Sequence, residues 1–482
     1  MFWLFALPLL IADVQVAGVN TGLKVQVTQK GLEYGGQFVV ELLKSVLMKE
    51  KIQDINGSYQ VPLVGNAQYS VWGLHVSQIQ EHNSTVGFAE GTGVSLGIRD
   101  AQVLLKGHWR LTTSLGSDSG TADIRIRQLF LSTVLGVDRG SGGRLRVWCA
   151  GCHSAIGDLD LTFYGGSSWL YNLFASSFKG SLQSEVNKQL CPELRKGIDD
   201  LARVLRTANV SAKMDSFAEM DYSVVNKPVI SADQFNMDLK GQFFRVGQPH
   251  TSPLVPAPFL LPDQPGSMLL LGISEFFANS AALVYFTSGA LRVNYTDKTI
   301  PKSIPFRLNT KSLGLFLPEL KQQFPDMAME IHITARKQPL LNFHPGGVDA
   351  AVFGAAEAFV VLPSARLASV FLLNIDANLT GQVLLEPVKS GKSIGRVGGS
   401  VALKRFRLSQ DRSSIGEIKV KFLEKVLYVA LQLASSRVNK RLKKGVALPN
   451  IYNATLVNPQ VAMYQGFMLI ATDLHYHPQV AA

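Results

Sequence analysis

An apolar stripe over residues 167–205 constrains the fold of this chain more than any other feature. Its members recur every three or four positions, which is the period of one helical face. They are Leu170, Leu173, Phe174, Phe178, Leu182, Val186, Leu190, Leu194, Ile198, Leu201 and Leu205. Ser167 or Ser168 can cap this helix, and Pro192 predicts a kink in it. At about 1.5 Å per residue the helix is roughly 50 Å long or more, so its apolar face requires an elongated, curved sheet as partner.

Two internal echoes predict that the chain contains two diverged copies of one domain. The sequence SEVNKQL at 184–190 recurs as SRVNKRL at 436–442, each time late in a long helical pattern. LKVQVTQKGL at 23–32 is echoed by LVYFTSGAL at 283–291, and we expect strands near residues 283–293. Because the echoes keep their order, each half is expected to contain a helix, twisted antiparallel strands and a long helix.

The first half follows this plan in its hydrophobic periodicity. Thr28 can cap a helix over residues 31–49, which has one apolar face. Residues 94–98 and 159–163 then alternate between apolar and polar side chains, as half-buried strands do. With 482 residues, 46% of them hydrophobic and 17% charged, the chain can build two large cores and has apolar surface to spare for a ligand.

The amino terminus indicates export. Residues 1–18 form an apolar run that ends in small residues, which predicts a secretory signal peptide cleaved near Gly18. No later run reaches the roughly 18 apolar residues that a membrane span requires. Six Asn-X-Ser/Thr sequons agree with a secreted, extracellular glycoprotein. They begin at Asn56, Asn83, Asn209, Asn294, Asn378 and Asn453.

Three cysteines in an oxidising compartment predict one disulfide and one remaining thiol. Cys149 continues an alternating strand pattern that places it on the apolar side with Leu145 and Val147. Cys152 is expected beyond that strand, freer to reach Cys191. We therefore expect the bridge Cys152–Cys191, contributing about 3–4 kcal/mol in the chain-entropy model, and a buried Cys149 thiol.

Charge points to an anionic partner. The formal net charge is +11, and the excess gathers between residues 389 and 444. A basic secreted protein meets anionic glycans, anionic lipids or bacterial envelopes before it meets nucleic acid. For residues 440–444 taken alone, a solvated helix face is the simpler interpretation.

No motif makes a convincing enzyme. GVSLG around Ser95 matches the hydrolase elbow, but alternating strand residues flank it where a sharp turn and a helix are required. Residues 391–393 resemble the end of a phosphate loop, yet Glu386 stands where its first glycine must be. His475 and His477 lie in a terminal tail with no visible partner for metal binding. We expect no catalytic residue, no metal and no cofactor.

One remaining feature suggests a function. The long helices carry more apolar surface than their packing on curved sheets requires. A cavity between helix and sheet suits acyl chains, because each buried methylene contributes about 0.8 kcal/mol without specific chemistry. The candidate lining residues are Phe38, Leu42, Trp169, Leu173 and Phe174. Ordinary core packing is the alternative interpretation for each of them.

Several motifs resemble, in order along the chain, the bactericidal/permeability-increasing protein and lipopolysaccharide-binding protein family. The first half contributes VTQKGLEY at 27–34, the spacing from Cys152 to Cys191 and the proline-rich centre. The second half contributes LGISEFF at 271–277, IPK at 300–302, FLPEL at 316–320, AFVVLP at 358–363, and the segment from RVNK at 437–440 to LP at 448–449. The match covers nearly the whole chain after residue 18, which makes it more specific than any single motif.

This resemblance implies an α+β fold shaped as a boomerang. Two similar barrels, each a twisted antiparallel sheet on a long helix, would be joined by a central sheet. After the signal peptide, residues 19–246 would form the amino-terminal barrel and part of the central sheet, residues 247–266 a proline-rich linker, and residues 267–482 the second barrel and part of the central sheet. Each barrel would hold a phospholipid in an apolar pocket, and a disulfide would match Cys152–Cys191.

The resemblance also implies a function, since members of this family bind lipid A of lipopolysaccharide or transfer plasma lipids. We expect a non-enzymatic lipid-binding protein of innate, antibacterial defence. Its expected partners are lipopolysaccharide, phospholipid and the bacterial outer membrane surface, and not nucleic acid. The alternative is a plasma-type carrier of phospholipid or neutral lipid without a role for bacterial glycolipid.

The expected lipopolysaccharide contacts are Lys49, Lys51, Lys106 and Arg110. They are sparser than the dense lysines that bactericidal members carry at the tip of the amino-terminal barrel. Phosphate binding by exposed cations is additive and sensitive to salt. We therefore expect lipid binding without potent killing of bacteria.

Overall fold

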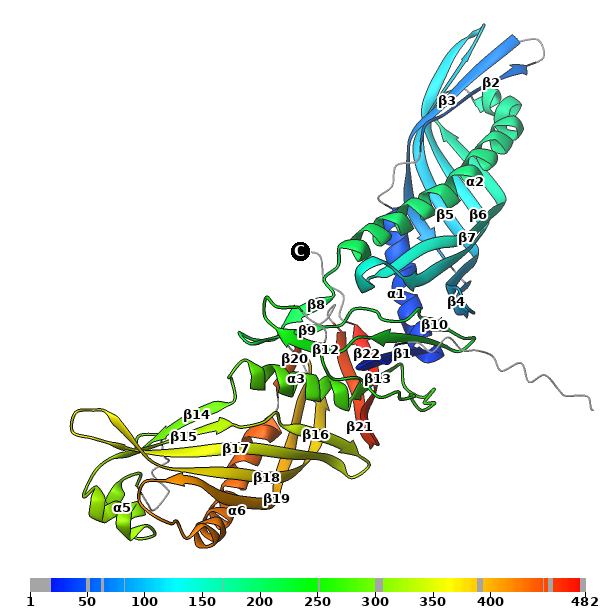
Figure 1. Cartoon of the computed structure of the whole chain (residues 1–482). Helices are drawn as coiled ribbons and strands as arrows, with labels where there is room; N and C mark the ends of the chain where they lie inside the picture. Colours follow the sequence, from blue (N-terminus) through cyan, green and yellow to red (C-terminus); the bar gives the residue numbers. More distant parts are fainter. Residues whose placement is uncertain are drawn as a thin grey trace, which may run out of the picture.

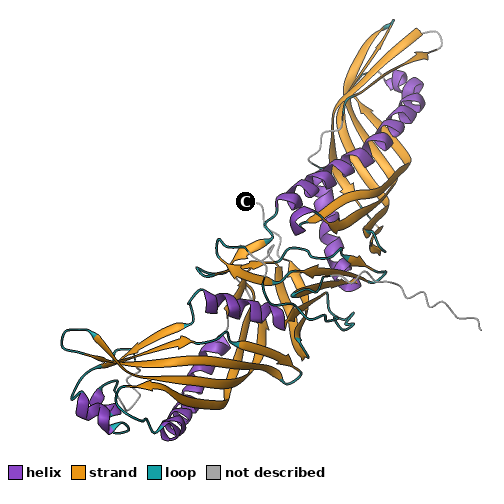
Figure 2. Ribbon diagram, in the orientation of Figure 1, coloured by secondary structure: helices purple, strands orange, loops and turns teal. Residues whose placement is uncertain are grey.

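The fold is elongated, with a sheet-rich half at each end and further strands between them (Figure 1). The computed structural model describes residues 19–48, 53–61, 65–81, 83–166, 168–249, 252–299, 307–387, 393–444, 446–449 and 454–476. Each half combines a curled antiparallel sheet with one long helix (Figure 2). The expected α+β architecture of two curled sheets joined by a central sheet is confirmed.

The amino-terminal sheet has the strand order β2-β3-β5-β6-β7, with β4 paired to β5. Its strands are β2 (Ile55–Val61), β3 (Gly65–Gln80), β4 (Asn83–Ala89), β5 (Gly93–Thr113), β6 (Gly116–Arg139) and β7 (Leu145–Tyr164). On β6, Ile124 and Ile126 are buried whereas Arg125 and Arg127 are exposed. This alternation gives the sheet an apolar inner face and a polar outer face.

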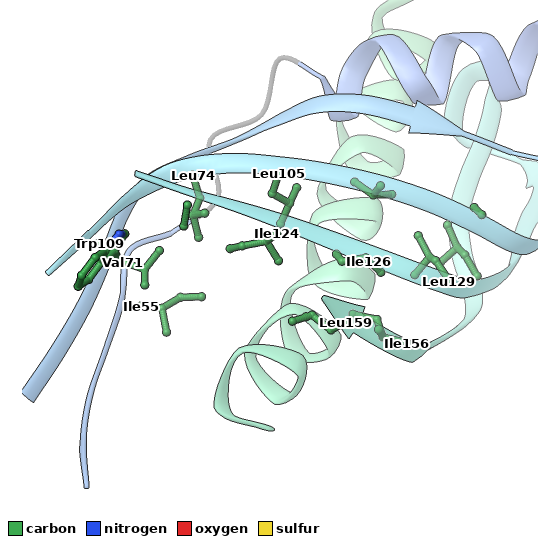
Figure 3. Close-up of a cluster of buried hydrophobic side chains, with 14 of the residues drawn as sticks. Ile55, Val71, Leu74, Leu105, Trp109, Ile124, Ile126, Leu129, Ile156 and Leu159 are labelled. Carbon is green, nitrogen blue, oxygen red and sulfur yellow. The ribbon is translucent and has the colours of Figure 1, made fainter. Parts of the chain in front are cut away.

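Helix α2 (Ser168–Thr207) packs against the inner face of this sheet. Figure 3 shows the buried cluster on that face, whose fully buried members include Leu105, Ile124 and Leu159. Leu190 and Leu194 of α2 pack against the cluster, while Leu201 further along the helix is 44% exposed. The predicted apolar stripe is therefore buried along only part of the helix. Pro192 lies inside α2, which continues through it.

Helix α1 (Gln29–Leu47) follows strand β1 (Leu23–Thr28) directly. The Thr28 hydroxyl oxygen accepts a hydrogen bond from the Gly31 amide at 3.3 Å, which confirms the predicted cap. None of the described helices has the length and apolarity needed to span a membrane.

The carboxy-terminal sheet has the order β14-β15-β17-β18-β19-β20, with β16 paired to β17. Its strands are β14 (Arg292–Thr296), β15 (Met329–Ala335), β16 (Leu340–His344), β17 (Gly347–Val361), β18 (Leu367–Pro387), β19 (Ser393–Ser413) and β20 (Val446–Pro449). Helix α6 (Val420–Lys444) lies on it through Leu423 and Leu427. Two short helices, α4 (Thr310–Leu313) and α5 (Pro318–Gln323), lie at its outer end (Figure 1).

The Asn of the repeated SRVNKRL segment attaches α6 to the sheet. Asn439 accepts a hydrogen bond from the Val401 amide at 2.7 Å and donates one to the Val401 carbonyl at 3.0 Å. Its counterpart in the first half, Asn187, accepts a bond at its backbone carbonyl from Ser154 of β7 at 3.5 Å. Each copy of the repeat therefore lies where a long helix meets the last long strand of its sheet.

A six-stranded central sheet of order β10-β11-β1-β13-β22-β21 combines strands from both halves. Its further strands are β10 (Val229–Ile230), β11 (Gln234–Leu239), β13 (Leu269–Ser274), β21 (Ala454–Tyr464) and β22 (Phe467–Tyr476). A small sheet of β8 (Ser211–Lys213), β9 (Ala218–Asp221) and β12 (Gln242–Arg245) lies beside it. The proline-rich segment is not a free spacer, because Phe259 and Leu261 pack against the buried Leu270 of this sheet.

The strands expected near residues 283–293 are wrong over most of that range, since only its last two residues belong to a strand, β14. Residues up to 287 belong to helix α3 (Glu275–Thr287), whose start is capped by the Ser274 hydroxyl oxygen accepting from the Phe277 amide at 3.4 Å. The helix has the sequence EFFANSAALVYFT, so apolar side chains occur on most of its sides, although its buried residues Phe276, Ser280 and Val284 share one face. Without one polar face, its periodicity cannot be separated from that of a buried strand. The counterpart of β1–α1 is therefore β13–α3.

The disulfide joins Cys152 of β7 to Cys191 of α2, across 39 residues. Strand β7 runs through both Cys149 and Cys152, so the expectation that Cys152 lies beyond the strand is wrong. A bulge opposite Val134 and Leu135 shifts the alternation between the two cysteines. Cys149 is a free thiol, half-buried rather than fully buried as expected.

We expect the Cys152→Ala/Cys191→Ala variant to be less stable than the parent by about 3–4 kcal/mol, because the unfolded chain regains the entropy of a loop of this size. Equilibrium unfolding in denaturant measures the difference. Cys149→Ala is the matched control and should change stability by well under half of that amount. Equal losses in the control and in the double variant would contradict the assignment of the stabilisation to the bridge.

Candidate functional site

The outer face of the amino-terminal sheet carries two of the expected lipopolysaccharide contacts. Lys106 and Arg110 are exposed on β5, with His108 between them stacked on Trp72 at a ring distance of 5.8 Å. Four residues of strand separate the two cations by about 13 Å. Lys49 and Lys51 lie outside the described residues. Of the four expected lipopolysaccharide contacts, Lys106 and Arg110 therefore lie on one polar surface.

The carboxy-terminal half contains an apolar cavity of about 410 Å³. Its lining comes from β16 to β19 and the end of α6, and includes Phe343, Val348, Val383, Val397, Gly399 and Leu442. This volume lies within the range of about 300–1,000 Å³ that is typical of small-molecule sites. A side chain at Gly399 would approach the Gln382 carbonyl oxygen to 2.4 Å, so the close packing of β18 on β19 keeps this part of the lining free of side chains.

The amino-terminal half has a smaller apolar cavity of about 40 Å³ between α1, α2 and the sheet. Leu190 and Leu194 of α2 and Ile79 of β3 line it. Lys44 of α1 also reaches it and forms an ion pair of 2.9 Å with Glu81. Burial works against the charge of Lys44, but hydrogen bonds to Glu41 and Glu81 outweigh it and raise its pKa above 10.5. Among the described side chains, this cavity has room for about one water-sized molecule.

The lining residues proposed from the sequence are not tested. Phe38, Leu42, Trp169, Leu173 and Phe174 lie in helices α1 and α2, but their side chains are outside what the structure describes. Leu190 and Leu442 line the two cavities instead. They are the last residues of the repeated SEVNKQL and SRVNKRL segments. The internal repeat is therefore the sequence signal that could have identified Leu190 and Leu442 as equivalent residues, each lining the cavity of its half.

The residues weighed for catalysis and metal binding lie in ordinary structural settings. Ser95 is the third residue of strand β5, with extended strand on both sides of it and no helix after it, and its hydroxyl donates to the Gly87 carbonyl at 3.1 Å. His475 belongs to strand β22, and His477 lies outside the described residues. Among the residues that the structure describes, no group of three or more His, Cys, Asp or Glu side chains gathers as a metal site would require.

Five of the six sequon asparagines are exposed, which leaves room for a glycan. These are Asn56, Asn83, Asn209, Asn294 and Asn378. Asn453 lies outside the described residues.

A polar cluster holds the strands together behind the larger cavity. Asp349 follows the cavity residue Val348 on β17 and lies 3.0 Å from the Lys404 ammonium of β19. Hydrogen bonds from Thr380, Lys404 and His344 lower the pKa of Asp349 from 3.8 to about 2, against an opposing effect of desolvation. The ionised carboxylate thus links β17, β18 and β19.

Two curled sheets that each close on a long helix, with an apolar cavity at the helix, define a class of lipid-binding and lipid-transfer proteins. Two family models match the chain and cover most of it: the N-terminal domain of the LBP / BPI / CETP family over residues 31–201 and its C-terminal domain over residues 212–476. The chain belongs to the LBP / BPI / CETP family.

Individual relatives agree with this assignment. A bactericidal permeability-increasing protein of Sebastes schlegelii is 33% identical over 460 residues, which cover 95% of this chain and 96% of the relative. The lipopolysaccharide-binding protein of Homo sapiens is 29% identical over 472 residues, covering 97% and 96%. A crystal structure of lipopolysaccharide binding protein matches with a TM-score of 0.60 at 27% identity, covering 95% of this chain and 100% of that one.

We expect Asp349→Asn to lower stability at neutral pH, because the neutral side chain loses the attraction of Lys404. The carboxylate has a depressed pKa in the folded chain, so its contribution is present above pH 3.8 and is lost as the pH falls through about 2. Denaturant unfolding of parent and variant at pH 6 and near pH 2 measures this difference. Asp263→Asn, at an exposed position in the proline-rich segment, is the control. A stability difference that persists undiminished near pH 2 would contradict the mechanism.

Proposed function

We propose that this chain is a secreted, non-enzymatic lipid-binding protein of innate defence that binds lipopolysaccharide and phospholipid. The observation that carries the proposal is the apolar cavity of about 410 Å³ in a member of the LBP / BPI / CETP family. The names of the relatives, bactericidal permeability-increasing protein and lipopolysaccharide-binding protein, favour bacterial glycolipid over plasma lipid as the ligand.

The cavity supports binding of an acyl chain through burial alone. Phe343, Val383 and Val397 present apolar surface to it, and each methylene removed from water contributes about 0.8 kcal/mol. We expect the purified protein to carry a phospholipid there, because the amino-terminal cavity beside Leu190 and Leu194 has a volume of only about 40 Å³. No bound group other than lipid is needed for this activity.

The exposed cations on β5 support contact with lipid phosphates. Lys106 and Arg110 point from the outer face of the amino-terminal sheet into solvent, where an anionic headgroup or the bacterial outer membrane surface can reach them. Exposed pairs of this kind act additively and are screened by salt, with a Debye length of about 8 Å at physiological ionic strength. Lys49 and Lys51 lie outside the described residues and stay candidates for the same contact on the sequence alone.

Titration against lipid A vesicles and zwitterionic phosphatidylcholine vesicles, at low and physiological salt, tests the function. We expect preferential binding to lipid A that weakens with salt, and a loss of roughly tenfold in affinity for Lys106→Ala/Arg110→Ala, since two exposed charges contribute about 1 kcal/mol or more in total. Lys298→Ala/Arg366→Ala removes two exposed cations from the other half and should change little. Equal, salt-insensitive uptake of both vesicles would identify a lipid carrier instead.

Lipid extraction with mass spectrometry tests the cavity. Val397→Phe places a ring in the larger cavity, and we expect the purified variant to hold less than half of the lipid of the parent because the space for the chain is reduced. Val293→Phe, at a position 43% exposed on β14, adds the same ring away from the cavity and should leave lipid content unchanged. A parent protein without extractable lipid would overturn this site.

A further inference from the structure

The outer face of the amino-terminal sheet has a polar concavity of about 370 Å³, on the opposite side of the strands from the core. Three glutamines and two arginines line it: Gln78 and Gln80 of β3, Gln102 of β5, and Arg125 and Arg127 of β6. The neighbouring Ile79, Ile124 and Ile126 point the other way, into the core. The concavity is therefore separate from both apolar cavities.

Irregular strand pairing produces this concavity. The register between β3 and β5 shifts at Val76 and Gln78, and the register between β5 and β6 shifts on both sides of Ala101. Asp100 and Gln128 adopt positive φ angles of 57° and 51° at these shifts. Such bulges bend a strand and redirect its side chains, which hollows an otherwise even sheet surface.

The charges of the two arginines are not equivalent. Arg127 forms an ion pair with Asp160 at 2.6 Å, which fixes its guanidinium and compensates its charge. Within the described part of the chain, Arg125 has no ion pair and the three glutamine carboxamides have no side-chain hydrogen bond. The concavity thus offers one arginine without an ion pair among the described residues, opposite Asp160 in the strand register, beside amide groups that can both donate and accept.

This combination fits a sugar that carries an anionic group. Carboxamides match hydroxyl groups, which also donate and accept, and a free guanidinium binds phosphate or carboxylate with two parallel hydrogen bonds. An apolar ligand finds little to contact, since only Val103 and Leu104 add apolar lining. A nucleic acid is not favoured, because it requires several uncompensated cations and aromatic surfaces.

The site continues the surface already assigned to the glycolipid. In the antiparallel register Lys106 pairs with Asp123, which places Lys106 diagonally beside Arg125 at about 7–8 Å. Gln102 lies four residues from Lys106 on β5, or about 13 Å along the strand. A headgroup held at Lys106 and Arg110 would therefore leave its attached sugars within reach of Arg125.

We propose that Gln78, Gln80, Gln102, Arg125 and Arg127 form a binding site for the anionic core sugars of a bacterial glycolipid. This proposal rests on the proposed function and adds a saccharide site distinct from the acyl-chain cavity and from the cations nearer the tip of the sheet. Arg125 binds the phosphate or carboxylate, and the glutamines bind hydroxyl groups of the same or the next sugar.

Calorimetric titration of the full chain with a fully deacylated, phosphorylated core oligosaccharide tests the site without any acyl chain. We expect measurable binding by the parent and about tenfold weaker binding by Arg125→Gln, because a charge-assisted hydrogen bond is lost. Gln78→Ala/Gln102→Ala should weaken binding as well, through lost hydroxyl contacts. Arg366→Gln, an exposed charge change in the other half, is the matched control and should bind as the parent does.

The outcomes separate this site from the proposed function. Lipid A vesicles without core sugars should lose much less affinity for Arg125→Gln than the oligosaccharide does. Binding to lipid A without binding to the oligosaccharide would overturn the saccharide site alone, as would equal affinities of Arg125→Gln and Arg366→Gln. If the parent binds neither lipid A vesicles nor the oligosaccharide, the proposed function is overturned as well. Equally tight, Arg125-dependent binding of a sulfated heparin hexasaccharide would overturn the assignment to bacterial sugars.

Discussion

The antiparallel pairing of β1 with β13 is the interaction on which the rest of the structure depends. Val25 lies opposite Leu271 at its centre, and the two ends are joined reciprocally: the Thr28 amide donates to the Met268 carbonyl at 3.2 Å, and the Ser274 amide to the Gly22 carbonyl at 3.0 Å. The same Thr28 and Ser274 residues cap α1 and α3. The pair thus holds one strand–helix unit of each half at the centre of a shared sheet, and so determines how the two halves are oriented.

The two halves share a plan but offer different interiors. Leu190 and Leu442 occupy the same place in the repeated helix segment, and each lines the apolar cavity of its half. In the first half, Lys44 reaches the cavity from α1 and pairs with Glu81, whereas in the second half glycines of β18 and β19 leave open space. The same architecture therefore leaves a cavity of only about 40 Å³ in the amino-terminal half and one of about 410 Å³, the size of a ligand site, in the carboxy-terminal half.

Strand alternation gives the amino-terminal sheet two chemistries on two faces. Ile79 and Ile126 contribute to the core beside α2, while Gln78 and Arg127 open onto the solvent side. A glycolipid is itself divided into acyl chains and charged sugars, which require these two environments. A protein of this family can thus present apolar interior and polar exterior to the two parts of one ligand without any catalytic group.

The sequence by itself determined the elements whose signal is local or periodic. These are the alternating strands, the long helices, the Thr28 cap, the repeated segments and the family resemblance, and they suffice for the fold and the class of ligand. It misplaced α3, which has apolar residues on most sides, and it ended β7 near Cys149 although the strand continues to Tyr164, because helix packing and bulges depend on residues distant in the chain. The cavity at Leu442 and the concavity at Arg125 were decided by tertiary structure alone, since each is formed by strand register between segments that no local pattern connects.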